Sequence, residues 1–147
     1  MLLARYHVLF LLSAIVVVAC AGSQQKTRQK DIVSLEKNIM QIHDEVMPKM
    51  SEIARLIPAL ETEAKNSNLD SILHQQIAKS IAELNAGDSL MWEWMHNYKM
   101  PENVSPDSIH AYLQSEKARI SKVRDAMLTG IKNAESLLQK LGHVQPN

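Results

Sequence analysis

The stretch that decides the fold of this chain is SLMWEWMHNYKMP, residues 89–101, which holds both tryptophans and three of the eight methionines. Three of its residues, Met91, Met95 and Tyr98, continue an apolar series that begins at Leu73. Apolar residues three or four positions apart are typical of one face of an amphipathic helix. The proline at the end of the stretch predicts a turn, because proline cannot donate the next helical hydrogen bond. The stretch therefore predicts the end of a long helix.

A second helical pattern precedes this stretch and is predicted to begin at Asp31, a favourable N-cap residue. Its apolar residues are again spaced by three or four: Ile32, Leu35, Ile39, Ile42, Val46, Met50, Ile53, Ile57, Leu60 and Ala64. Pro48 and Pro58 lie within this pattern. Each removes a backbone donor, so a kink or break is expected at both.

A third helical pattern follows the stretch. Ser105 is its predicted N-cap, Pro106 takes the first helical position, and Gly142 predicts the end. In the middle pattern, Gly87 and Asp88 fall in a gap of the apolar series and predict a local kink.

Three helical segments of similar length joined by short turns predict an all-α fold, an elongated antiparallel three-helix bundle with up-down-up topology. The turns are expected near Ser67 and Pro101. The bundle is assigned to residues 31–142 and a short tail to residues 143–147. Only four glycines and a hydrophobic fraction of 46% agree with a single helical domain that has a core.

The N-terminal region has the pattern of an export leader. Arg5 precedes an apolar run over residues 8–19, which is too short to span a bilayer but matches the hydrophobic part of a signal peptide. The only cysteine, Cys20, follows directly, and residues 17–20, VVAC, resemble the lipobox of bacterial lipoproteins. This resemblance implies a signal peptide over residues 1–19 and acylation of Cys20. The alternative is an ordinary secretory leader with an unmodified cysteine.

Residues 20–30 are polar and are expected to act as a tether between the anchor and the domain. More than one acyl chain holds a protein stably on a membrane. By similarity to the sorting of enteric lipoproteins, Ala21 directs the protein to the periplasmic face of the outer membrane. Removal of residues 1–19 takes away Arg5 and no acid, which leaves fifteen basic against sixteen acidic residues. Such a balance provides no basic field for nucleic acid.

The hairpin register brings unusual side chains together. A turn near Ser67 places His43 level with Met91, and a turn near Pro101 places Met95 level with His110. Seven side chains are thus predicted to converge in the membrane-proximal half: His43, Met47, Met91, Trp92, Met95, His96 and His110. Thioether and imidazole ligands suit Cu(I) or Ag(I), and the Trp92 ring could add a cation–π contact.

Ordinary packing is the favoured interpretation of these residues, because methionine fills irregular cores and the proline and glycine positions create irregular space. A di-iron site would use Glu93-x-x-His96, but the only similar spacing is Asp107-x-x-His110 and the inward-facing glutamates of such bundles are lacking. There is no His-Glu-x-x-His, no phosphate-binding glycine loop and no Gly-x-Ser-x-Gly. We therefore expect a protein that is not an enzyme.

Residues 42–50 (IHDEVMPKM), residues 91–98 (MWEWMHNY) and residues 112–135 resemble a group of small lipoproteins from Bacteroidota, often labelled viral A-type inclusion proteins. The resemblance implies a helical lipoprotein of the cell envelope and brings no activity with it. The sequence thus predicts a lipid-anchored structural or interaction module that could contact another envelope protein. The alternative is a periplasmic Cu(I)/Ag(I)-binding protein.

Overall fold

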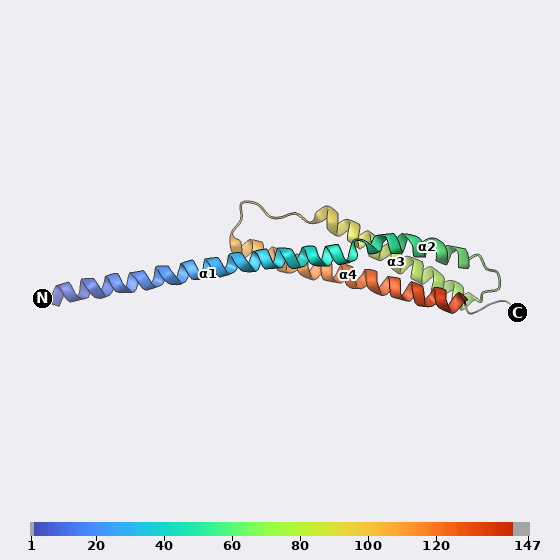
Figure 1. Ribbon diagram of the computed structural model, residues 1–147, viewed down its shortest axis with the longest axis horizontal. Coiled ribbons are helices and arrows are strands. Elements are labelled where there is room, and N and C mark those ends of the chain that lie inside the picture. Colours follow the sequence, from blue (N-terminus) through green and yellow to red (C-terminus); the bar gives the residue numbers. More distant parts are fainter. Residues whose placement is uncertain (1, 143–147) are drawn as a thin grey trace.

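The computed structural model describes residues 2–142, with side chains from residue 24 onward, and is helical over most of that range (Figure 1). Its four helices are α1 (Leu2–Val46), α2 (Lys49–Glu63), α3 (Ser71–Asn97) and α4 (Pro106–Gly142). The predicted tail, residues 143–147, lies outside the described residues.

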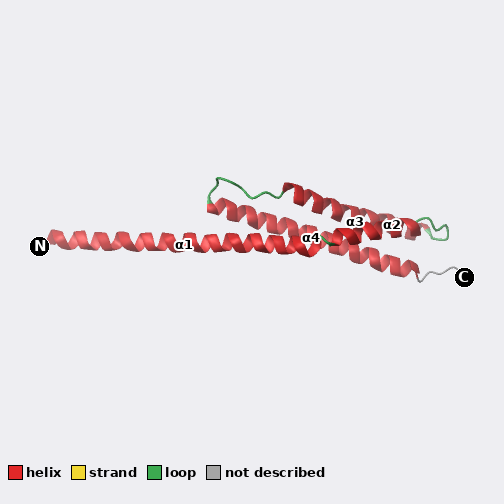
Figure 2. Cartoon of the chain, turned by 45° about the horizontal axis from the view of Figure 1, so that its top comes forward, coloured by secondary structure: helices red, strands yellow, loops and turns green. Residues whose placement is uncertain are grey.

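The helices form an elongated up-down-up bundle, which confirms the predicted fold class (Figure 2). Helices α1 and α2 together make the first rod, α3 runs back antiparallel to it, and α4 returns parallel to α1 (Figure 1). The N-terminal part of α1 continues beyond the other helices as a single helix (Figure 2). Within the described part of the chain, no helix is long and apolar enough to cross a membrane.

The buried residues follow a seven-residue repeat in each rod. The repeat consists of Ile32, Ile39, Val46, Ile53 and Leu60 in α1 and α2; Ile77, Leu84 and Met91 in α3; and Leu113, Ile120, Met127, Ala134 and Leu141 in α4. A repeat of seven keeps one seam of each helix turned toward its neighbours, as in coiled coils. The interval from Val46 to Ile53 is also seven, so α2 continues the buried seam of α1.

The two prolines of the first rod have different effects. At Pro48 the helix breaks as expected. The next turn is narrower than an α-helical turn, because its hydrogen bonds span three residues instead of four: Met50 N donates to Met47 O and Ser51 N donates to Pro48 O, both at 3.2 Å. Helix α2 runs on unbroken through Pro58. That proline is exposed, so the carbonyl that it leaves unbonded can be solvated. The expected break therefore occurs at one of the two sites.

Helix α1 begins far before Asp31, so the predicted N-cap there is wrong. Residues 24–30 are helical and mostly exposed. They contain Gln, Lys and Arg, which favour helices, and neither glycine nor proline. Arg28 pairs with Asp107 in the first turn of α4, with 2.8 Å between Nε and Oδ1, and attaches this part of α1 to the bundle. The described part of the predicted tether is thus helical.

The starts of α3 and α4 follow capping rules. The N-cap of α3 is Asp70, whose carboxylate accepts a 2.8 Å hydrogen bond from Leu73 N. In α4, Ser105 Oγ accepts from Ser108 N at 3.2 Å, just before Pro106, as predicted. Helix α3 has no break at Gly87, and that glycine is buried against α4.

The connection between α3 and α4 shifts their register. It runs from Tyr98 to Ser105 along the bundle rather than turning tightly (Figure 1). Asn103 takes a left-handed conformation with φ of 58°, which asparagine tolerates better than most residues. This loop extends toward the N-terminal end of α1. Helix α4 therefore starts closer to that end of the molecule than it would after a tight turn. The predicted pairing of Met95 with His110 is therefore displaced.

Candidate functional site

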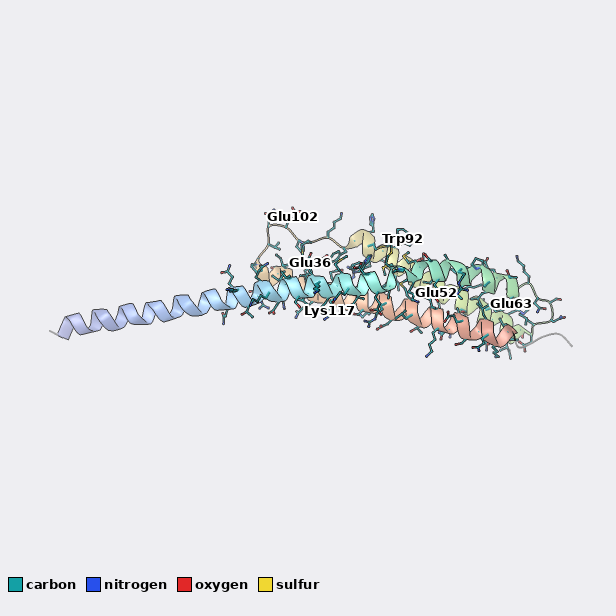
Figure 3. All side chains as sticks on the ribbon, in the orientation of Figure 1. Glu36, Glu52, Glu63, Trp92, Glu102 and Lys117 are labelled. Atoms are coloured by element: carbon teal, nitrogen blue, oxygen red, sulfur yellow. The ribbon has the colours of Figure 1, made fainter. Side chains whose placement is uncertain are left out.

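The seven residues of the predicted cluster differ widely in exposure. Met91 is fully buried, whereas Met47 is 45% and Trp92 is 62% exposed. His96 is exposed too. Trp92 is labelled on the outer side of α3 in Figure 3. These side chains therefore do not face a common interior point.

The remaining three, His43, Met95 and His110, are half-buried. Met95 packs against the hydrophobic core, and His43 Nδ1 lies 2.9 Å from Asp44 Oδ1. The His43 ring lies against Trp94, one helical turn from the predicted Met91. His110 belongs to the part of α4 displaced by the extended loop.

The described side chains do not test the predicted metal site or the predicted acylation site. Among these, no group of three His, Cys, Asp or Glu could hold a metal ion. The Cu(I)/Ag(I) site, which would also use methionine, stays a prediction, and Met91 has an ordinary core role in the seven-residue repeat. Cys20, the predicted acylation site, lies in the part of α1 whose side chains are outside the described set.

The structure instead gathers an aromatic layer from three helices and the start of the loop: His43, Trp94, Tyr98 and Tyr112. The ring centroids of Trp94 and Tyr98 are 4.8 Å apart and those of Tyr98 and Tyr112 are 6.3 Å apart, both stacked at 22°. The centroid of the His43 ring lies 5.7 Å from that of Trp94, and the two rings are tilted by 35°. Such stacks add specific geometry to the burial of apolar area.

A buried carboxylate completes this layer. Glu116 of α4 is only 3% exposed. Its Oε2 accepts a 3.0 Å hydrogen bond from Trp94 Nε1, and its Oε1 accepts a 2.9 Å bond from Arg119 Nη1. A buried charge is tolerated when both oxygens are paired in this way. The hydrogen bond from Trp94 ties α3 to α4.

The aromatic layer fills a wide space between two helices. Among the described residues, no Cα atom of α1 comes within 8 Å of a Cα atom of α3, although both helices pack on α4. The rings of His43 and Trp94 bridge this separation. The layer therefore sets the spacing of the rods in this half of the bundle.

Sequence reasoning did not single out Glu116, although a signal for it exists. Leu113 and Ile120 are predicted core positions seven residues apart, and Glu116 lies between them on the same face. A charged residue at such a position predicts a polar partner in the core. Trp94, one of two tryptophans on α3, is a suitable donor, although the predicted register does not place it level with Glu116.

Tyr98 provides a test of this layer by pH. Its Oη is buried without a hydrogen-bond partner among the described residues. Burial raises the pKa of the Tyr98 phenol, and the nearby Glu36 adds to the rise. A raised folded-state pKa gives stability that is present below the unfolded value of about 10 and lost as pH rises through the folded value.

We therefore expect melting by circular dichroism to show a steeper loss of stability above pH ~10 for the parent protein than for Tyr98→Phe. Near neutral pH the variant should melt at the same temperature or slightly higher, because it removes an unbonded buried hydroxyl. Parallel declines of the two proteins with alkaline pH would contradict this role for Tyr98.

An open hollow of about 190 Å³ lies beside the Glu116–Arg119 pair, between α3 and α4. Its lining includes the apolar Leu90 and Val123 and the charged Glu93 and Lys122. It is open and small compared with typical ligand pockets. The contacts of the aromatic layer thus hold the three helices together.

Comparison with known proteins adds no relatives: no family model matches the chain, and neither a curated protein nor a solved structure is significantly similar to it. The class that the fold defines is an elongated antiparallel three-helix bundle with a projecting N-terminal helix. The resemblance to small Bacteroidota lipoproteins stays a prediction.

Proposed function

We propose that the protein is a lipid-anchored helical bundle of the cell envelope, without enzymatic activity, that serves as a structural or interaction module. Its anchor is acylated Cys20, and its domain faces the periplasm from the outer membrane. The observation that carries this proposal is the position of the single cysteine, directly after the apolar run of residues 8–19.

The course of α1 supports an anchored domain. The helix runs from the leader region into the bundle without a break. Among the described side chains, the first ion pair to another helix is that of Arg28 with Asp107, and Arg28 comes eight positions after Cys20. At 1.5 Å per residue, about 12 Å of helix separates the anchor from the bundle. A helical connection of this kind would hold the bundle close to the bilayer.

An exposed apolar side chain supports an interaction role. Trp92 of α3 is 62% exposed. An exposed tryptophan is typical of protein–protein contact surfaces, in which tryptophan often supplies much of the binding energy. Another protein of the envelope is therefore the proposed partner.

Acylation can be tested directly in cells given an alkyne-bearing fatty acid. The parent chain should incorporate the label, and mass spectrometry should find a mature N-terminus at Cys20 carrying acyl chains. Cys20→Ser should carry no label and keep its leader, because the hydroxyl does not replace the thiol in lipoprotein processing. Ser23→Ala, a nearby control, should label as the parent does. An unacylated mature N-terminus in the parent protein would overturn the proposal.

A further inference from the structure

Residues 26–40 of α1, where this helix begins to pack on α4, carry an exposed face of mixed basic and apolar character. It consists of Lys26, Lys30, Val33, Lys37 and Met40, spaced by four, three, four and three residues, and is called here the basic stripe. This spacing places all five on one side of the helix. Val33 is 56% and Met40 is 38% exposed, and the three lysines are exposed too. Glu36 borders this face between Val33 and Met40, and Asp44 lies one turn beyond Met40.

The rest of the bundle does not cover the basic stripe. The buried seam of α1 runs through Ile32, Leu35 and Ile39, on the opposite side of the helix. Helices α3 and α4 therefore lie behind α1 when α1 is viewed from the stripe. None of the three lysines forms an ion pair within the described residues. Their charge is available to a partner outside the domain.

We propose that the basic stripe lies on an anionic lipid surface, with the lysine ammonium groups on headgroup phosphates and with Val33 and Met40 at the acyl boundary. This inference rests on the proposed anchor at Cys20. Lys26 follows that cysteine by six residues, or about 9 Å of helix, and the stripe extends about 21 Å. Lysine clusters next to a membrane attachment bind anionic lipid, and apolar residues among them deepen the contact.

The charge and the position of the stripe favour lipid over a protein partner. A lipid anchor at Cys20 keeps this face within reach of the bilayer at all times, so weak contacts suffice. Each lysine should favour the orientation in which the stripe contacts the lipid surface about fivefold, and the three together should favour it on the order of a hundredfold. With α1 flat on the membrane, the bundle would lie along the surface and present α3 and α4 to the periplasm.

The test uses the full mature protein, extracted with its anchor and reconstituted into phosphatidylethanolamine vesicles with or without phosphatidylglycerol. An environment-sensitive dye is placed at Ser34→Cys, beside the stripe, and in a separate sample at Gln114→Cys on α4. The dye at position 34 should shift to the blue and be quenched by spin-labelled lipid only in the anionic vesicles, and high salt should reverse both effects. The dye at position 114 should not respond.

Two matched variants separate the stripe from net charge. The triple variant Lys26→Gln, Lys30→Gln and Lys37→Gln should lose the response at position 34. The control Lys65→Gln, Lys122→Gln and Lys132→Gln removes the same charge from exposed sites elsewhere and should keep it. Circular dichroism verifies the helical fold of each, because exposed substitutions of this kind change stability little.

The outcomes also distinguish this inference from the anchor itself. If the mature protein does not float with vesicles of either composition, the anchor is absent and the proposed function fails with the inference. If it floats with both and the dye at position 34 reports the same environment in each, the anchor stands and the inference is wrong. An acidic protein partner on the stripe would give this second result.

Discussion

Trp94→Ala is expected to lower the free energy of unfolding by about 3–5 kcal/mol, the largest effect of any single side chain considered for this protein. Trp94 is only 3% exposed, stacks on Tyr98 and lies against His43. Its removal leaves a cavity between rods whose backbones are already far apart. It also takes away the donor that pairs with Glu116 Oε2, and an unpaired buried carboxylate adds to the cost. Urea denaturation followed by circular dichroism measures the loss.

The neighbouring tryptophan is the matched control. Trp92 lies two residues away on the same helix and is 62% exposed, so Trp92→Ala should change stability by no more than about 0.5 kcal/mol. Trp94→Phe should fall between the two variants, because it keeps an aromatic ring but loses the Nε1 donor and part of the buried ring volume. Equal destabilisation by Trp92→Ala and Trp94→Ala would show that the aromatic layer does not set the spacing of the rods.

The fold was predictable because it depends on a one-dimensional pattern. The apolar spacing on three segments, the cap at Ser105 and the proline at position 48 are local signals, and each has its predicted effect. The start of α1 could not be predicted from N-cap preferences alone. Asp31 is a favourable N-cap, but the residues before it also favour a helix, so nothing there ends it.

The site was less predictable because it depends on how one helix is placed along another. The level of α4 against α3 depends on whether the connecting loop turns tightly or runs along the bundle, and the sequence of Tyr98 to Ser105 does not distinguish the two. The sequence predicted that His43 of α1 lies level with Met91 of α3. In the structure α3 is offset along α1 by about one turn, so Trp94 lies beside His43 instead. One turn is therefore enough to change which side chains meet between α1 and α3.

Close packing at one point of α3 and α4 complements the wide spacing near Trp94. A Cβ atom built on Gly87 would lie 3.3 Å from both Cα and Cγ of Met127, and one built on Gly130 would meet nothing closer than Glu83 O at 3.5 Å. Met127 Cα belongs to the backbone of a long helix, so it cannot move away as a flexible side chain can. The two glycines thus differ in the room that they leave, although both are buried between α3 and α4.

Gly87→Val should therefore destabilise the protein by about 1–3 kcal/mol, because its branched side chain forces α3 away from Met127 and loosens the seam between α3 and α4. Gly130→Ala, at the site of ordinary contact, should instead stabilise it by up to about 1 kcal/mol, since alanine favours a helix over glycine. Urea denaturation of both variants measures whether the free energy of unfolding falls for Gly87→Val and rises for Gly130→Ala. A Gly87→Val protein as stable as the parent would mean that the two helices separate there without cost, and that their approach at Gly87 does not determine the packing of the bundle.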